Sequence, residues 1–210
     1  MTRLQLKLRI LGNLKDPTGV FWTDTKLNDS VQDAYDEIIQ ETECIEKLYT
    51  LASIPGVIYY DLYNIINDFW KITRLYSNQT NRWISIYDQQ VLNRNYYSWE
   101  KSIGTPWCAY IVNFQYLAFF PHSTSNQTFD IYYKVGKDTL ADDSQLVQIP
   151  DTFIKVIEDW CTADLLESVQ EFSKAKVFWQ DYILELGRFK DHVRARALPI
   201  ERQILEPSMP

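Results

Sequence analysis

The spacing of hydrophobic residues predicts helices near both ends of the chain. In the first part, apolar residues recur every three or four positions after Thr23 or Asp24, either of which can cap a helix, and the pattern ends near Leu48. In the last part, the pattern restarts with Asp151 as the expected N-cap and continues to the region of Gly187, which predicts a helical hairpin. The apolar positions are Leu27, Val31, Ala34 and Ile38, and later Ile154, Ile157, Cys161, Leu165 and Val169.

The middle of the chain has the shorter hydrophobic runs that are typical of strands. A polar turn at residues 77–81 joins two of them, and Asn113 with Phe114 joins two others, so each set predicts a hairpin. Residues 88–97 have the spacing of a short helix between the hairpins. The expected strands are residues 50–54, 69–76, 82–87, 106–112, 115–120 and 129–135. We therefore interpret residues 50–147 as a small antiparallel sheet.

One strand supplies the predicted core of this sheet domain. Trp83, Ile84 and Ile86 lie on it, and we predict all three as core residues, although strand alternation lets only one of the two faces pack fully. The start of the chain leaves two structures open. The apolar positions of residues 4–10 fit a strand by period two and a helix by longer spacing.

The composition is that of a folded protein with an acidic surface. Of the 210 residues, 46% are hydrophobic, which is enough for a core, and the length indicates one domain with or without an insertion. The net charge of -7 argues against tight DNA binding, which needs clustered Lys and Arg, but it suits a surface past which DNA moves. No apolar run is long enough for a membrane helix or a signal peptide, so we expect a soluble protein made in a cytoplasm.

Few residues carry reactive chemistry. Cys44, Cys108 and Cys161 are widely spaced and include no CxxC pair, so we expect free, mostly buried thiols. His122 and His192 are the only histidines, and neither stands in a catalytic motif. The sequence has no serine nucleophile elbow, phosphate-binding loop, dinucleotide fingerprint or zinc-protease motif. We therefore predict no enzymatic activity, no metal and no cofactor.

Two other features could form a site but are more typical of other roles. The acidic pairs Asp142-Asp143 and Glu158-Asp159 could bind a hard cation or act as glycosidase carboxylates, but adjacent acids are usually solvated surface. The many Tyr and Trp residues could stack on sugars or bases, although their alternation along strands suits core packing better. Aromatic doublets on a strand place one ring on each face, so part of the aromatic surface would be interface in an oligomer.

The C-terminal region differs in charge from the segment before it. Acids outnumber bases from Asp151 to Glu185, whereas bases outnumber acids from Arg188 to Pro210. Pro199 argues against simple continuation of the last helix. A basic, proline-bearing segment with few core residues is typical of a docking tail, and a frayed end without function is the alternative.

Short motifs follow one another in a definite order from residue 16 to residue 196. They are Asp16-Pro17, Phe21-Trp22-Thr23-Asp24, Ile54-Pro55, Trp83-Ile84-Ser85-Ile86-Tyr87-Asp88, Gly104-Thr105-Pro106-Trp107, Leu117-Ala118-Phe119-Phe120-Pro121, Ile131-Tyr132-Tyr133-Lys134 and Ile149-Pro150-Asp151-Thr152-Phe153. In this order they resemble the head-tail connector, or adaptor, family of tailed bacteriophages, whose members dock beneath the portal ring. Residues 57–68 depart from the family pattern, because they are longer and more aromatic than its usual strand.

The resemblance implies an α+β fold, a bundle of long α-helices with an inserted small antiparallel β-domain. It divides the chain into four segments. They are residues 1–49 with the first long helix, 50–148 as the inserted β-domain with a short helix, 149–197 as C-terminal helices packing on the first helix, and 198–210 as a C-terminal docking arm.

The resemblance also implies a structural protein of the virion neck, assembled in the host cytoplasm and without enzymatic activity. Its implied partners are the portal ring, neighbouring copies in a dodecameric ring and a downstream neck or tail protein. Double-stranded DNA would pass through the ring without sequence-specific binding, and no membrane is involved. The resemblance places portal docking on the C-terminal segment, where we predict Pro199, Ile200, Ile204, Leu205 and Pro207 as docking residues.

Two other interpretations stay open. Another phage neck or tail protein, such as a tail terminator, would share the ring arrangement but contact a different partner. A carbohydrate-binding accessory module would explain the aromatic residues and the small sheet. Binding to immobilised glycans distinguishes the second interpretation from the first.

Overall fold

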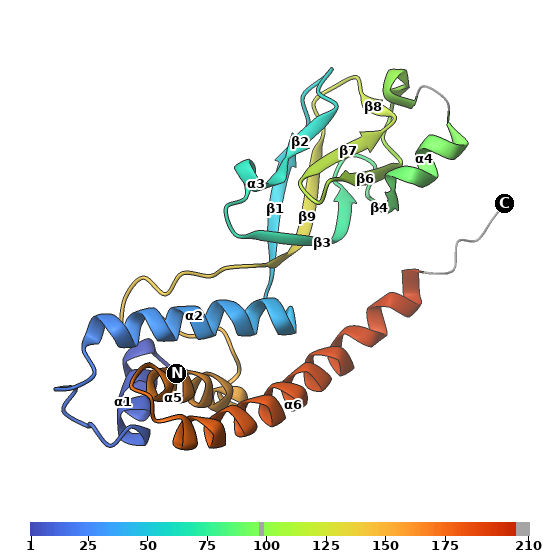
Figure 1. The fold of residues 1–210 in the computed structure, drawn as a ribbon. Helices are drawn as coiled ribbons and strands as arrows, with labels where there is room; N and C mark the ends of the chain where they lie inside the picture. Colours follow the sequence, from blue (N-terminus) through green and yellow to red (C-terminus); the bar gives the residue numbers. More distant parts are fainter. Residues whose placement is uncertain (97–98, 205–210) are drawn as a thin grey trace. The chain divides into compact units, whose positions relative to one another are not determined.

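The computed structural model describes residues 1–96 and 99–204, and it divides into two compact units (Figure 1). The helical unit comprises Met1–Cys44 together with the chain from Lys137 onward. The sheet unit is Ile45–Gly136. None of the helices in the described part of the chain combines the length and the apolar character needed to cross a membrane.

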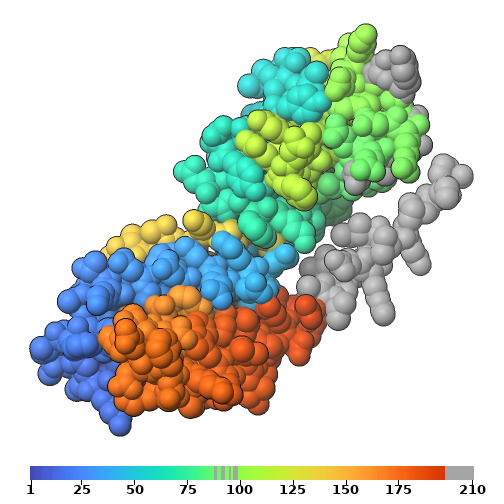
Figure 2. All heavy atoms as spheres, in the orientation of Figure 1, coloured from blue at the N-terminus to red at the C-terminus, as the bar shows by residue number. Residues whose placement is uncertain are grey.

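In the helical unit, α5 packs against each of the other long helices. The elements are α1 (Arg3–Asn13), α2 (Asp24–Thr42), the 3-10 helix η2 (Asp151–Phe153), α5 (Lys155–Ser168) and α6 (Phe172–Ile204). In the space-filling view, the lighter blue of α2 lies beside the red of α6 (Figure 2), and hydrogen bonds from Tyr182 to Glu37 and from Lys190 to Glu41 join the two helices. Fully buried residues from α1, α2 and α5 include Ile10, Val31, Tyr35, Ile157 and Cys161, so the core forms around α5.

The N-terminal residues form a helix rather than a strand. The side chain of Thr2 accepts a hydrogen bond from the backbone N–H of Gln5, and the Gln5 side chain accepts one from the backbone of Thr2, which is a capping box. Leu6 and Ile10, four positions apart, are fully buried. Helical spacing therefore decides which apolar residues of this segment enter the core.

Helix α2 begins where the sequence predicts but ends earlier. Thr23 is the N-cap, and its hydroxyl accepts a hydrogen bond from the backbone N–H of Lys26. The helix ends at Thr42 because Glu43 adopts a left-handed conformation with φ of 49°. The predicted end near Leu48 is therefore wrong, and the next residues form a strand instead.

Two expectations for the last helices are wrong, although the helical hairpin of α5 and α6 is confirmed. Asp151 does not cap a long helix, because it opens the single turn η2 and accepts a hydrogen bond from the N-terminal amine of Met1 (2.9 Å). Helix α6 continues past Gly187 and through Pro199. The φ of proline is close to the helical value, and its missing N–H removes one backbone hydrogen bond, so a long helix can accommodate it at some cost.

The sheet unit contains a seven-stranded sheet with strand order β1-β9-β3-β4-β6-β7-β2 and a two-stranded sheet of β5 and β8. The strands are β1 (Glu46–Ala52), β2 (Tyr59–Asp61), β3 (Phe69–Ser77), β4 (Arg82–Asp88), β5 (Ile103–Gly104), β6 (Cys108–Val112), β7 (Tyr116–Phe120), β8 (His122–Ser123) and β9 (Thr128–Val135). Helices α3 (Leu62–Ile65) and α4 (Gln89–Asn95) and the 3-10 helix η1 (Trp99–Lys101) connect them.

The predicted fold class, a bundle of long α-helices with an inserted small antiparallel β-domain, is wrong. The chain is mixed, with 26% of its residues in strands and a large curled sheet of seven strands. This sheet is not purely antiparallel, because β4 pairs with β6 in parallel. A parallel pair needs a long crossover, and the connection from β4 to β6, which contains α4 and η1, supplies one.

Both predicted hairpins are present, and left-handed turn residues close them. In the turn between β6 and β7, Asn113 and Phe114 have φ of 51° and 60°. Two successive positive φ angles are the signature of a tight hairpin turn whose twist matches that of the strands. In the turn between β3 and β4, Asn81 has φ of 51°. Asparagine tolerates this conformation better than most residues do.

The three predicted core residues of β4 have different environments. Ile84 is buried, with 6% of its surface exposed, and it lies opposite the buried Leu75 of β3. Ile86 is half-buried. Trp83 is 49% exposed and does not belong to the core, because successive residues of a strand point to opposite faces. The prediction of Trp83 as a core residue is corrected accordingly.

Candidate interaction surfaces

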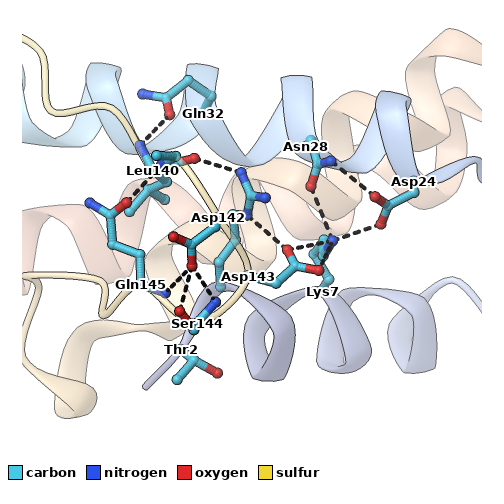
Figure 3. Close-up of polar contacts among 12 residues, drawn as sticks. Thr2, Lys7, Asp24, Asn28, Gln32, Leu140, Asp142, Asp143, Ser144 and Gln145 are labelled. Atoms are coloured by element: carbon cyan, nitrogen blue, oxygen red, sulfur yellow. Dashed lines mark hydrogen bonds and ion pairs between the residues drawn. The ribbon is translucent and has the colours of Figure 1, made fainter.

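A buried lysine fixes the N-terminal helix within the helical unit (Figure 3). Lys7 of α1 is 3% exposed, and its ammonium donates hydrogen bonds to Asp24 Oδ1 (2.6 Å), Asn28 Oδ1 (3.1 Å) and Asp143 Oδ2 (2.9 Å). Asp24 and Asn28 belong to α2, whereas Asp143 lies in the segment before η2. The hydrogen bond from Lys7, together with its positive charge, lowers the pKa of both carboxyl groups.

In the acidic pair Asp142-Asp143, Asp143 binds a second cation, Arg3, and Asp142 stabilises a local turn. Arg3 Nε donates to Asp143 Oδ1 (2.9 Å), and its Nη1 donates to the carbonyl of Leu140 (2.6 Å). Asp142 Oδ1 accepts a hydrogen bond from the backbone N–H of Ser144 (2.8 Å). The acidic pair could have formed a cation site, but instead it joins the segment before η2 to α1 (Figure 3).

We expect Lys7→Met to lower the free energy of unfolding by about 2 kcal/mol, because it removes charge-assisted hydrogen bonds from a buried position. The matched control is Lys26→Met, since Lys26 is exposed. The measurement is urea denaturation at several pH values. Asp24 and Asp143 have folded pKa values below 3.8, so their contribution is present above that pH and is lost as the pH falls through the folded values. An unchanged midpoint at pH 7 would contradict the structural role of Lys7.

The pair Glu158-Asp159 is divided between two different contacts. Glu158 Oε1 accepts a hydrogen bond from Arg9 Nη1 (3.0 Å), which links α5 to α1. The Asp159 side chain is 3% exposed and lies 3.7 Å from Lys155 Nζ. Burial raises the pKa of Asp159 to about 6, and the nearby Asp181 adds to the shift. Among residues 1–96 and 99–204, no group of three or more His, Cys, Asp or Glu residues is placed to hold a metal ion.

Asp159→Asn should raise the free energy of unfolding by about 1 to 2 kcal/mol at pH 7.5. The folded pKa lies above the unfolded one, so the folded state binds the extra proton and this group stabilises the fold most at low pH. That stabilisation is lost as the pH rises from about 4 through about 6. Thermal unfolding of wild type, Asp159→Asn and the exposed control Asp191→Asn between pH 4 and pH 8 checks this. A steeper pH dependence in Asp159→Asn than in wild type would contradict it.

The histidines and cysteines are placed for packing. His122 is 4% exposed, burial lowers its pKa, and its ring centroid lies 6.1 Å from that of Trp99. His192 lies over Phe153, with 5.0 Å between ring centroids. None of the three cysteines forms a disulfide, as predicted, and burial raises the pKa of Cys108 to about 11. A thiol with such a raised pKa remains protonated near neutral pH and is a weak nucleophile.

The face of the sheet opposite Ile84 carries aromatic rings around one guanidinium. Arg74 Cζ lies 5.6 Å from the ring centroid of Trp83 and 4.5 Å from that of Tyr132. Its Nη2 donates to Glu46 Oε1 at 2.5 Å. The Trp83 plane is inclined by 50° to that of Tyr132 and by 68° to that of Tyr76. These rings do not form one flat stacking surface, which argues against the carbohydrate-binding interpretation.

A groove of about 1030 Å³ lies in the sheet unit where β3 and β4 diverge. β3 pairs with β4 only over Leu75–Ser77, whereas β4 pairs with β6 from Ser85 onward, so the two strands separate there. Aromatic and aliphatic side chains dominate the lining. They include Trp70, Ile86 and Phe114, and Phe114 is 85% exposed. The half-buried state of Ile86 is explained by its place in this groove.

The five predicted docking residues lie at or beyond the end of α6. Pro199, Ile200 and Ile204 belong to the backbone of α6. Leu205 and Pro207 lie outside the described residues. Portal docking by these residues stays a prediction.

The sequence analysis did not predict which apolar residues the helical unit leaves exposed. They include Val177, Ile183 and Leu184 on α6, Leu4 and Leu8 on α1, and Val20 and Phe21 before α2. The spacing of apolar residues along α6 did contain a signal for the exposed residues of this helix. Ala175, Tyr182 and Phe189 recur every seven residues and are buried, so apolar residues two positions after the first two of them must lie on another face of α6.

Comparison with known proteins identifies one related group. A protein-family model described as SU10 adaptor protein matches residues 1–203, which includes both units. No curated protein matches the chain.

Proposed function

The chain belongs to the SU10 adaptor protein family, a family of phage adaptors, and we propose that it is a structural head-to-tail adaptor of a tailed phage. In this proposal, copies form a ring below the portal that joins the capsid to the tail and lines the DNA channel. The observation that carries the proposal is the family match over residues 1–203, because it extends across both units rather than one motif. As a phage adaptor, the protein is associated with the virion and with other phage capsid or tail proteins.

Charge and the placement of the polar residues support this function. The net charge of -7 disfavours tight attachment to the DNA phosphates, as a conduit for DNA requires. The acidic pairs serve contacts between elements of the helical unit, and the described histidines pack against aromatic rings. We therefore propose a protein without enzymatic activity.

The partners follow from the same proposal. The segment 198–210 docks on the portal through Pro199, Ile200, Ile204, Leu205 and Pro207, neighbouring copies complete a ring of twelve, and a downstream neck or tail protein binds the ring. The four-segment division of the chain and assembly in the host cytoplasm belong to this proposal too. A tail terminator is the alternative, and it differs in binding the tail tube rather than the portal.

Mixing the purified chain with portal rings of the same phage tests the function. The expected result is an added ring of density below the portal in electron micrographs, together with co-sedimentation of the two proteins. The matched control is the same chain mixed with tail tubes. Binding to tail tubes and not to portal rings would favour the tail terminator, and binding to neither would overturn the proposal.

A further inference from the structure

The groove between β3 and β4 is bounded by two strand edges that have no partner strand. The two strands pair at one end only, over Leu75–Ser77 of β3. If this ladder continued in register, Thr73 would pair with Ile86, but that pair does not form. Beyond this point, β3 pairs with β9 and β4 pairs with β6, each on the side away from the groove. Within the described residues, each strand therefore presents an open edge to the groove.

Two β-bulges in β3 explain why the strands separate. The register of β3 against β9 shifts twice, and at each shift β3 has one extra residue, first Trp70 and then Thr73. A bulge bends the strand that carries it and increases its local twist. The bends carry β3 away from β4, so the groove is a consequence of how β3 pairs with β9.

Four aromatic side chains that line the groove are exposed to solvent. They are Tyr63, Trp70, Tyr87 and Phe114, with exposed fractions of 43%, 45%, 41% and 85%. Aromatic residues are enriched at protein interfaces, because they bury a large area with few rotatable bonds. Several exposed rings around one groove are therefore a typical feature of a surface that another molecule covers.

A glycine holds one of these rings in place. A Cβ added at Gly136 would lie 3.2 Å from Trp70 Cβ and 3.3 Å from Trp70 Cε3, so a larger residue would push Trp70 away. The backbone N–H of Gly136 donates to the carbonyl of Asp68 (2.9 Å), which fixes the backbone beside the ring. A side chain that is fixed before binding loses little conformational entropy on contact. This observation is independent of the open strand edges and concerns the same groove.

The open edges determine what kind of partner fits. A strand edge presents backbone N–H and C=O groups at the regular spacing of a strand. An extended polypeptide supplies matching acceptors and donors at that spacing, and its alternate side chains can cover the exposed rings. A small apolar ligand would cover the rings but would leave both strand edges without hydrogen bonds. The groove therefore favours an extended peptide segment.

This segment must have both of its own edges free, because it enters between two strands. Every strand of the seven-stranded sheet is already paired on at least one side, so none of them can enter the groove of a second copy. Residues 205–210 include Pro207 and Pro210, which lack the backbone N–H that a ladder needs. The segment therefore comes from a different protein, and a phage adaptor associates with other capsid or tail proteins.

We propose that the β3–β4 groove binds an extended segment of another capsid or tail protein, which adds a strand between β3 and β4. The backbone of this segment pairs with the open edge of β3, and its alternate side chains pack on the aromatic rings of the groove. The inference goes beyond the proposed function. It assigns a docking site to the sheet unit and depends on neither the portal contact nor the ring.

A short synthetic peptide tests strand addition to the full chain. The probe is acetyl-Lys-Val-Thr-Val-Thr-Val-Lys-amide, which alternates apolar and polar side chains as a half-buried strand does. The matched control peptide has proline in place of both threonines, so it keeps the valines and loses two backbone N–H groups. Titration followed by NMR measures the affinity, and amide hydrogen exchange locates the residues that the peptide protects.

The probe should bind the wild-type chain with a dissociation constant of about 1 mM or lower. Binding should slow the exchange of backbone amides within residues 70–74 of β3, because main-chain hydrogen bonds provide the affinity in strand addition. The proline peptide should bind at least about tenfold more weakly, since its valines remain but its backbone pairs poorly.

A variant of the chain tests whether the probe occupies the groove. Phe114→Asn removes the most exposed of the four rings, and asparagine tolerates the positive φ of this turn position. It should lower the affinity for the probe by about tenfold and keep the wild-type melting temperature. The matched control is Ile103→Asn, because Ile103 is 72% exposed and does not line the groove. It should bind the probe as wild type does.

Four results would overturn the inference. They are a probe that does not bind, a proline peptide that binds equally well, protection of β1, which is the long open edge of the same sheet, instead of β3, and self-association of the wild type that Phe114→Asn abolishes. The last result would assign the groove to a second copy. Portal co-sedimentation is measured separately, so failure of the proposed function and failure of this inference are distinguishable.

Discussion

Ile84→Ala should lower the free energy of unfolding of the sheet unit by about 3 kcal/mol, and Trp83→Ala should lower it by about 1 kcal/mol. The smaller residue has the larger effect because Ile84 is 6% exposed and Trp83 is 49% exposed. Removing the Ile84 side chain leaves a cavity in a packed interior. Removing Trp83 forfeits only its contacts on the solvent side, where Tyr76, Tyr132 and Arg74 lie against its ring.

Urea denaturation followed by circular dichroism and tryptophan fluorescence measures both variants against wild type. Ile84→Val is the matched control, since it removes one methylene group from the same site and should cost about 1 kcal/mol. If Trp83→Ala proved the more destabilising of the two alanine variants, the assignment of the two faces of β4 would be wrong.

Deleting residues 198–210 should abolish co-sedimentation with portal rings and leave the rest of the fold intact. The deletion shortens α6 at its C-terminal end and leaves Phe189, which is buried, in place. The helical unit should therefore keep its circular dichroism and its cooperative melt. A terminal segment that buries its apolar residues against a partner contributes to the interface rather than to the core.

A shorter deletion, of residues 205–210, separates the two parts of the docking segment. It keeps Pro199, Ile200 and Ile204 and removes Leu205 and Pro207, so partial portal binding is expected. If the long deletion unfolds the protein, the segment is core. If it binds portal rings at full strength, docking lies elsewhere on the chain.

Local sequence signals determined several elements of this protein. Thr23 begins α2 because its hydroxyl satisfies a backbone N–H of the first helical turn. Asn113 and Phe114 form the turn of a hairpin between two apolar runs, and their pattern is visible within a few residues. That the three cysteines form no disulfide also followed from their spacing. The order of short motifs indicated the adaptor family before any contact was known.

Contacts between distant residues decided what the sequence left open. The seven-stranded sheet and its parallel β4–β6 pair depend on which strands meet across long connections, and no local pattern encodes that choice. The sequence of β4 fixes that Trp83 and Ile84 point to opposite faces, but only the packing of the other strands determines which face is covered. Likewise, Asp143 resembles a solvated acid in the sequence, and only the fold brings it within 2.9 Å of Lys7. Local chemistry thus set the elements, and long-range packing set their neighbours, because burial and ion pairing depend on residues far apart in the chain.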